Sequence, residues 1–253
     1  MTATDTGSRA GRAPRTPGAL RALYRLMLET QVNRARILSL SALGLVSVLV
    51  GLAIGHSGTA NPLRSGAQFV FSFGLAVLVP VATLVFASAA LGDPNEDGTL
   101  VYLWLRPVAR WKIVLAAAMA SFTVTWPIVT IPLTIGAALT GGGRSLVTAT
   151  IAAVTVSTIG YTGLFVALGL RLKRALVWGL LYIFIWEGFV ASANNTAARL
   201  AVRSYGRSIL TSITGQTFRF SQISNPWAWL VPLAVCIVGL AYATWRLAHQ
   251  DID

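Results

Sequence analysis

Six long apolar runs place the strongest constraint on what this chain can fold into. They lie at 37–56, 67–91, 113–139, 146–170, 175–193 and 227–247, and each approaches or exceeds the roughly 20 apolar residues that a helix needs to cross a bilayer. The runs are continuous, whereas strands of a membrane β-barrel alternate apolar and polar residues over about ten positions. The sequence therefore predicts an all-α integral membrane protein with six transmembrane helices, forming a domain over 37–247.

Composition agrees with a membrane protein rather than a soluble one. Hydrophobic residues make up 55% of the 253 residues and charged residues only 11%, against about 25% charged residues in a soluble domain. The net charge of +12 could suggest nucleic acid, but basic residues beside apolar runs more commonly orient membrane proteins. We therefore expect membrane lipids as partners and no nucleic acid. Cys236 stands alone, which allows neither an intrachain disulfide nor a thiolate metal cluster.

The basic residues also predict how the spans are oriented. With the N-terminus inside, most of the 20 Lys and Arg residues fall in cytoplasmic segments. The outer segments hold fewer, namely Arg64, Arg144, Arg199, Arg203, Arg207 and Arg219. Because loops rich in Lys and Arg stay on the cytoplasmic side, both termini are predicted to be cytoplasmic.

The segments before and after the spans have distinct compositions. Residues 1–18, rich in Thr, Gly, Ala, Arg and Pro, are predicted to be a disordered cytoplasmic tail, and 248–253 a second, short one. Segment 19–36 has one apolar helical face flanked by arginines, formed by Leu20, Leu23, Tyr24 and Met27. That pattern is typical of an interfacial helix whose axis lies in the membrane plane.

The polar stretch 93–112 carries a helix-start signature. Asp93 can act as N-cap, Pro94 fits the first helical position, and Glu96 lies three residues after the cap, which is a capping-box arrangement. An apolar face follows, and Pro107 ends the pattern. We expect a short helix over 93–106 at the cytoplasmic membrane surface. It is either a docking element or a solvated connector.

The loop at 194–226 predicts a second amphipathic helix, on the outer side. Its arginines recur at four-residue spacing on one face, while apolar side chains form another, and the two sets are Arg199, Arg203 and Arg207, and Val202, Tyr205 and Ile209. Such a helix would rest on the outer leaflet with the arginines towards lipid phosphates. It would serve as an interfacial lid or as a surface for a partner.

Glu187 is the one ionisable residue well inside an apolar run. A charge at mid-membrane costs roughly 2.5–3.5 kcal/mol on insertion scales, so such a residue usually faces a cavity or a partner. Glu187 therefore lines a translocation path, or it supports local packing and contacts an outer-loop arginine such as Arg199. Pro80, which removes a helical hydrogen bond and loosens its helix, is a second candidate for the path.

Signatures of catalysis are missing from the sequence. It contains no HExxH, no Gly-x-Ser-x-Gly and no phosphate loop of the GxxxxGK[ST] type. His56 and His249 fall at opposite membrane faces, so they cannot share a metal. We expect no catalytic residue, no metal site and no cofactor bound by this chain.

The stretch after the second run resembles a known family, the ABC-2-type permeases. The resemblance rests on Glu96, Gly98-Thr99-Leu100, Arg106-Pro107-Val108 and Arg110-Trp111. Pro94 stands where many members carry a second acidic residue. The resemblance implies that eight residues form the coupling contact with an ATPase, namely Asp93, Glu96, Gly98, Thr99, Leu100, Arg106, Pro107 and Arg110.

The same resemblance implies a function and partners. The chain would be the transmembrane subunit of a type V ABC exporter in the bacterial cytoplasmic membrane. It would pair with a second permease, identical or homologous, above two ATPase subunits that bind ATP and Mg. A drug, lipid, peptide or glycan would cross by alternating access. Two alternatives stay open, a membrane enzyme centred on Glu187 and a membrane anchor or receptor that uses the outer helix.

Overall fold

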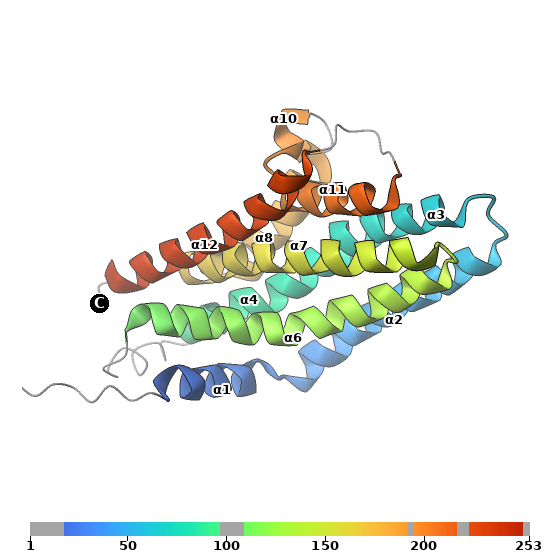
Figure 1. Ribbon diagram of the computed structural model, residues 1–253. Helices are drawn as coiled ribbons and strands as arrows, with labels where there is room; N and C mark the ends of the chain where they lie inside the picture. The colour runs from blue at the N-terminus through green and yellow to red at the C-terminus, as the bar shows by residue number, and fades with distance from the viewer. Residues whose placement is uncertain (1–17, 97–108, 192–194, 217–222, 250–253) are drawn as a thin grey trace, which may run out of the picture.

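The computed structural model describes residues 18–96, 109–191, 195–216 and 223–249, and within these ranges it is almost entirely helical, with no strand. Figure 1 shows how its helices are arranged. In chain order they are α1 (Ala19–Gln31), α2 (Arg34–His56), α3 (Pro62–Phe69), η1 (Val70–Leu78), α4 (Val79–Glu96), α6 (Arg110–Leu139), α7 (Gly143–Arg171), α8 (Ala175–Leu181), η2 (Tyr182–Val190), α10 (Asn195–Ala198), α11 (Val202–Thr214) and α12 (Asn225–His249).

Five helical segments are long and apolar enough to cross a membrane. They are Arg34–His56, Pro62–Pro94, Arg110–Leu139, Gly143–Arg171 and Asn225–His249, which match five of the predicted runs. The run predicted at 175–193 corresponds to the apolar segment Ala175–Val190. At 1.5 Å per residue this segment is about 24 Å long, shorter than the roughly 30 Å hydrocarbon core. The chain is therefore helical and multi-pass in character, and five helices among its described residues are long enough to span a membrane.

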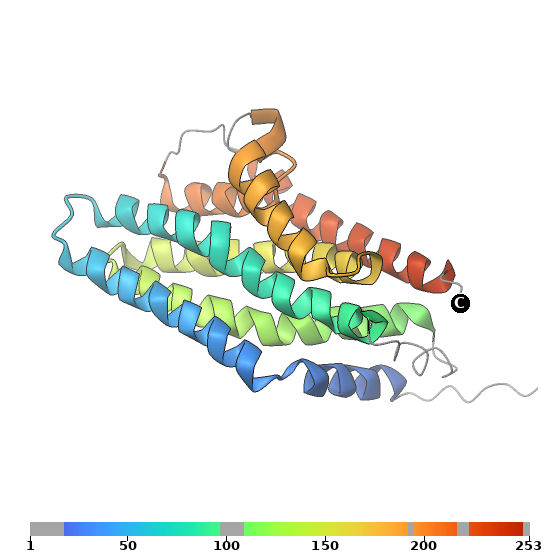
Figure 2. The same cartoon turned by 180° about the vertical axis from the view of Figure 1, so that it is seen from behind.

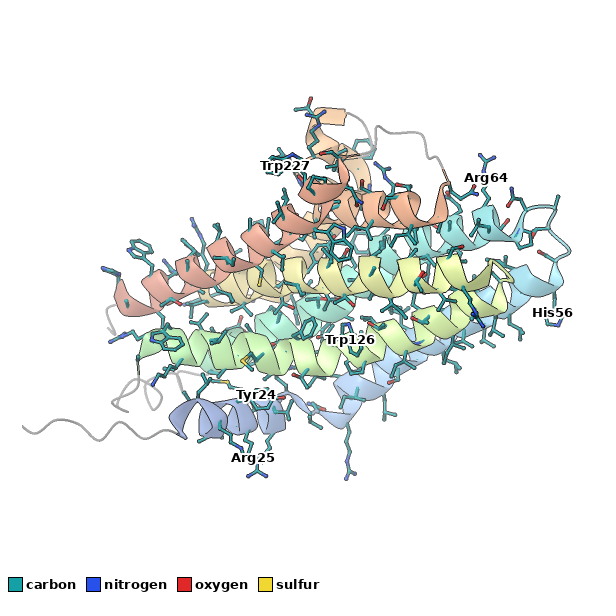
Figure 3. The ribbon with its side chains drawn as sticks, viewed as in Figure 1. Tyr24, Arg25, His56, Arg64, Trp126 and Trp227 are labelled. Carbon is teal, nitrogen blue, oxygen red and sulfur yellow. The ribbon has the colours of Figure 1, made fainter. Side chains whose placement is uncertain are left out.

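Helix α7 lies at the centre of the bundle and packs against α4, α6, α11 and α12. Figures 1 and 2 show α1, the end of α4, the start of α6 and the end of α12 together at one end, which we call the α1 end. The α2–α3 connection and the α6–α7 turn lie at the opposite, far end. Figure 3 places His56 and Arg64 there.

Glycines bring neighbouring backbones into contact. A Cβ at Gly163 of α7 would overlap the backbone of Cys236, and one at Gly239 of α12 would overlap the backbone of Gly163. Gly51 of α2 lies equally close to Gly136 of α6. The pair Gly51-x-x-x-Gly55 therefore packs within this chain, as small residues do between membrane helices.

Two helical segments, η1 and η2, have the wider π-helical hydrogen bonding, from each residue to the fifth before it. The η1 segment ends just before Pro80, which is buried near the start of α4. Proline has no N–H for a regular helical bond, and the helix changes from π to α geometry at this point. Segments η1 and η2 contact each other.

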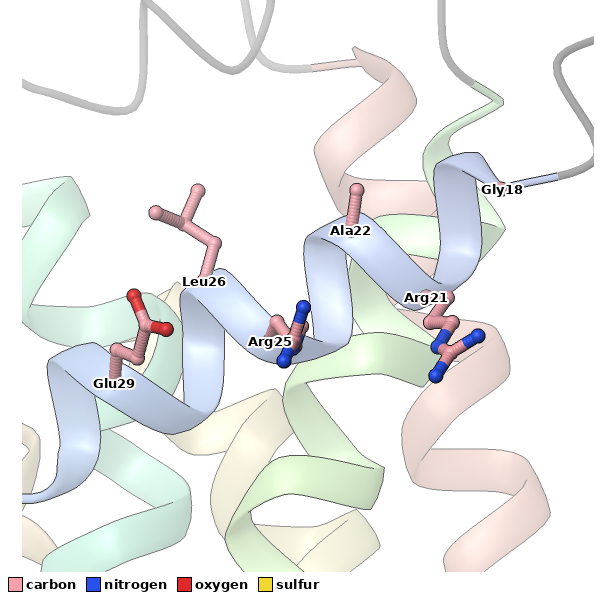
Figure 4. A pocket seen from close by; sticks show the side chains of 6 residues that line it. All are labelled: Gly18, Arg21, Ala22, Arg25, Leu26 and Glu29. Atoms are coloured by element: carbon pink, nitrogen blue, oxygen red, sulfur yellow. The ribbon is translucent and has the colours of Figure 1, made fainter.

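Helix α1 has the apolar face that the sequence predicts. Leu23 and Met27 are buried, and the Tyr24 hydroxyl donates a hydrogen bond to Thr123 of α6 (3.1 Å). Figure 3 shows Tyr24 towards α6 and Arg25 away from it. The exposed face carries Arg21, Arg25 and Glu29 (Figure 4).

The extent and orientation of α1 differ from the prediction. It ends at Gln31 instead of residue 36, because Asn33 caps α2 by accepting a bond from the N–H of Ala35 (3.0 Å). It also lies alongside the first half of α6, not across the end of the bundle (Figures 1 and 2). The apolar face that suggested a lipid surface is covered by α6.

Candidate functional site

The α1 end contains a group of polar contacts that tie the helices together. Glu96, at the end of α4, accepts a hydrogen bond through Oε1 from the backbone N–H of Arg174 (2.6 Å). Arg174 has a left-handed backbone, with φ of 60°, and precedes the first residue of α8. A carboxylate is favourable there because the first N–H groups of a helix carry partial positive charge. Glu96 therefore joins α4 to the start of α8.

Two further contacts complete this group, which we call the end cluster. Arg110 Nη1, at the start of α6, donates to the carbonyl of Leu247 near the end of α12 (2.6 Å). Arg36 Nη2, in the first turn of α2, pairs with the Asp93 carboxylate of α4 (2.8 Å). The end cluster comprises Arg36, Asp93, Glu96, Arg110, Arg174 and Leu247, and its contacts join α2 to α4, α4 to the start of α8, and α6 to α12.

The end cluster flanks the stretch predicted to couple to an ATPase. Glu96 and Arg110 stand on either side of residues 97–108. The predicted coupling residues within that stretch, Gly98, Thr99, Leu100, Arg106 and Pro107, lie outside the described residues.

The predicted helix start at Asp93 is wrong. Helix α4 continues through Asp93 and Pro94 and ends at Glu96. The Asp93 carboxylate binds Arg36, and the Glu96 carboxylate binds the N–H of Arg174, so the two do not form a capping box. Both acids find partners on distant segments, which a local sequence pattern does not show.

Glu187, on η2, is enclosed by hydrogen-bond donors. Its side chain is buried, with the residue 1% exposed. The Tyr161 hydroxyl donates to Oε2, and Oε1 accepts from the Tyr182 hydroxyl (3.2 Å) and from the N–H of Val202 (3.1 Å). Phe165 stacks on Tyr161, with ring centroids 5.5 Å apart. Every oxygen of the carboxylate is thus satisfied.

The contacts of Glu187 favour one of its two predicted roles. Val202 is the first residue of α11, and the preceding Ala201 makes no side-chain cap, so Glu187 supplies the missing cap from another segment. Arg203, one residue further on, is close enough to interact with the carboxylate electrostatically. The carboxylate therefore supports packing and fixes α11, and in this conformation it is closed to water. Arg199 is not among its hydrogen-bonding partners.

Helix α11 is the predicted outer helix, in a different setting. Val202, Tyr205 and Ile209 are buried, as their shared face predicts. The helix packs against α7, α12 and η1 instead of resting on a lipid surface. A position within the bundle hides most of its surface, which an amphipathic pattern alone cannot distinguish from a lipid-facing one.

The arginines of this region do not form the predicted row. Arg203 and Arg207 lie on α11 over the Phe71 ring of η1, at 6.0 and 5.2 Å from its centroid. Arg199 precedes the helix, and its carbonyl accepts a hydrogen bond from the Tyr205 hydroxyl. Burial, and secondarily the charge of Arg203, lowers the pKa of the Arg207 guanidinium.

Sequence reasoning missed the tyrosines that hold Glu187. Tyr161 lies inside an apolar run, where a phenol needs a buried acceptor. Its position could therefore have indicated a polar partner inside the bundle. Tyr182 lies five residues before Glu187, a spacing that places two side chains on different faces of an α-helix but suits the i to i+5 repeat of η2. A search at helical spacing of three or four could not pair them.

The described residues contain no group of three or more His, Cys, Asp or Glu that could hold a metal ion. His56 and His249 end α2 and α12, at opposite ends of the bundle. No protein-family model and no curated protein matches the chain.

Proposed function

We propose that this chain is the transmembrane permease subunit of an ATP-driven exporter of the ABC-2 type. It would work with a second permease chain, identical or homologous, and with separate ATPase subunits that bind ATP and Mg. The observation that carries the proposal is the end cluster, because it links both flanks of residues 97–108 to helices throughout the bundle.

A coupling element must pass displacement to the spans without loss. Movement of the chain at Glu96 would pull on the start of α8 through the N–H of Arg174 (2.6 Å). Movement at Arg110 would pull on the end of α12 through the carbonyl of Leu247 (2.6 Å). An ATPase that pressed on residues 97–108 would therefore act on helices on both sides of α7.

The proposal includes a sixth span and an orientation. Segment α8–η2 would cross the membrane with local thinning of the bilayer, which costs only fractions of a kcal/mol per Å of mismatch. The α1 end would face the bacterial cytoplasm, since it carries Arg21, Arg25, Arg110, Lys112 and Arg171.

Labelling of single cysteines tests the orientation. In a Cys236→Ser background, Ser57→Cys and Ser145→Cys at the far end should react with a membrane-impermeant thiol reagent added to intact cells. Glu29→Cys, exposed on α1, should react only after the cells are opened. Reaction of Glu29→Cys in intact cells would reverse the orientation and remove the docking argument.

Co-purification and ATPase activity test the function. The full chain, purified from its own membranes in mild detergent, should bring an ATPase with it, and reconstituted complexes should show transport-coupled hydrolysis. Arg110→Gln, which shortens the side chain and removes the guanidinium that binds the carbonyl of Leu247, should insert normally and lower coupling about tenfold, as expected for a charge-assisted hydrogen bond. Arg144→Gln, an exposed arginine at the far end, is the matched control. Full coupling in Arg110→Gln, or no ATPase partner, would contradict the proposal.

A further inference from the structure

An apolar groove runs between α7 and α12 and reaches the α1 end. Its volume is about 550 Å³. Its walls are aliphatic, formed chiefly by Leu164, Ala167 and Leu168 of α7 and by Val231, Val235 and Val238 of α12. Both helices run towards the α1 end, so the groove has one part near the middle of the bundle and another at the α1 end, which we call its mouth (Figure 1).

A fixed cation stands at the mouth. Arg171, the last residue of α7, lines the groove together with Tyr242 of α12. Arg171 Nη1 donates to the Tyr242 hydroxyl (2.9 Å), and the guanidinium lies 6.0 Å from the centre of the tyrosine ring. Because one tyrosine holds the guanidinium in two ways, the cation is positioned before any ligand arrives.

A second arginine lies one helical turn beyond Tyr242. Arg246 is on the same face of α12, and its Nε is buried without a hydrogen-bond partner among the described residues. Arg246 lies beyond the residues that line the groove, and its guanidinium adds a second positive charge on the side of the α1 end.

The charge around the mouth is positive. Lys173 and Arg174 follow Arg171 in the turn to α8, and both are exposed. Among the described contacts of this turn, the one acidic side chain is Glu96. Its Oε1 already accepts a hydrogen bond from the N–H of Arg174. Basic residues at the mouth of a pocket between membrane helices recognise anionic headgroups.

The groove has cations at its mouth and an aliphatic wall along its length, and these two parts match the headgroup and the acyl chain of an amphiphile. From Leu164 to Arg171 the groove wall is about 10 Å long, at 1.5 Å per residue, which is the length of part of one acyl chain. A helix of another protein in this groove would have to bring an acidic residue to Arg171, because burial of that charge alone is costly. A lipid with a phosphate headgroup satisfies both parts.

We propose that the α7–α12 groove binds an anionic phospholipid from the leaflet at the α1 end. The phosphate lies on Arg171 and Arg246, and an acyl chain occupies the aliphatic groove. This inference does not depend on the exporter function, because it needs only a bilayer around the bundle.

Native mass spectrometry of the delipidated full chain tests the site. Dioleoylphosphatidylglycerol and dioleoylphosphatidylcholine are added at equal concentrations in mild detergent. Both lipids carry a phosphate, but the quaternary ammonium of phosphatidylcholine is repelled by the basic residues at the mouth, so the anionic lipid should bind about tenfold more tightly. Arg171→Gln and Arg246→Gln should each remove most of that preference, and Arg171→Lys should keep part of it.

Two further variants separate the groove from general surface charge. Ala234, which lines the groove and is exposed, can become Trp without entering the core, and Ala234→Trp should weaken both lipids several-fold. Arg64→Gln, an exposed arginine at the far end, should change nothing. Equal binding of the two lipids, equal loss in Arg64→Gln, or unchanged binding in Ala234→Trp would each overturn the proposal. Gel filtration and circular dichroism establish that each variant is folded.

Discussion

Glu96 and Glu187 make the same kind of contact in opposite surroundings. Each accepts a hydrogen bond from a backbone N–H at the start of a helix, Arg174 before α8 and Val202 in α11. Glu96 is exposed at the α1 end, whereas Glu187 is 1% exposed and also binds two tyrosine hydroxyls.

The difference lies in what is left when the carboxylate is removed. Water can replace the exposed Glu96, so the loss is close to that of an ordinary helix cap, about 1 kcal/mol. Tyr161 and Val202 are buried and Tyr182 is partly buried, and each unsatisfied buried donor costs about 1–3 kcal/mol. The exposed setting of Glu96 suits a contact that changes during a transport cycle. The buried setting of Glu187 suits a fixed structural contact.

The largest effect is expected at Glu187. Glu187→Ala leaves two phenols and the N–H of Val202 without their acceptor, and it should lower the free energy of unfolding by about 3 kcal/mol or more. Glu187→Gln keeps one acceptor oxygen and should cost about half as much. Thermal unfolding in detergent, followed by tryptophan fluorescence, measures both.

Glu29→Gln on the exposed face of α1 is the control for that series and should change stability by less than about 0.5 kcal/mol. A loss in Glu187→Ala no larger than the control would mean that the donors find other acceptors, and the contrast between the two carboxylates would disappear.

A smaller effect on stability is expected at Glu96. Glu96→Ala should cost about 1 kcal/mol and leave the chain inserted, while it separates the end of α4 from the start of α8. Under the proposed function, the same variant should lower ATPase coupling far more than stability. Parallel measurements of unfolding and coupled hydrolysis would show this, and a proportional fall of both would place Glu96 with Glu187 as an architectural residue.

The smallest effect is expected at the ion pair of Arg36 and Asp93, whose side chains are 29% and 50% exposed. Such a pair contributes about 0–1 kcal/mol and is screened by salt. A double-mutant cycle with Arg36→Gln and Asp93→Asn should give a coupling energy in that range at low salt and near zero at 1 M salt. A salt-independent coupling would show that the pair is shielded from solvent.

The sequence predicted those features that follow from repetition along one segment. The apolar runs appear as helices, and the faces of Leu23 and Met27, and of Val202 and Ile209, are buried. The start assigned to Asp93 failed because the pattern was local, while the real partner, Arg36, lies 57 residues earlier. Cross-chain partners of this kind leave no periodic signal.

Glu187 illustrates a second limit. Its position in an apolar run marked it as a residue that needs partners, but the partners depend on backbone geometry. Tyr182 reaches it because η2 is π-helical, and Val202 reaches it because the chain turns back after α10.

The crossing of α7 and α12 has the properties of a fulcrum. Where Gly163 and Gly239 meet, no side chain separates the backbones, so the helices can tilt about this point more easily than they can separate at it. Leu247, held by Arg110, lies about 12 Å along α12 from Gly239, at 1.5 Å per residue. A pull on this arm of the lever would swing the other arm, with Pro232, in the opposite direction against α11. A displacement of α12 at the α1 end would therefore move the other half of this helix in the opposite direction.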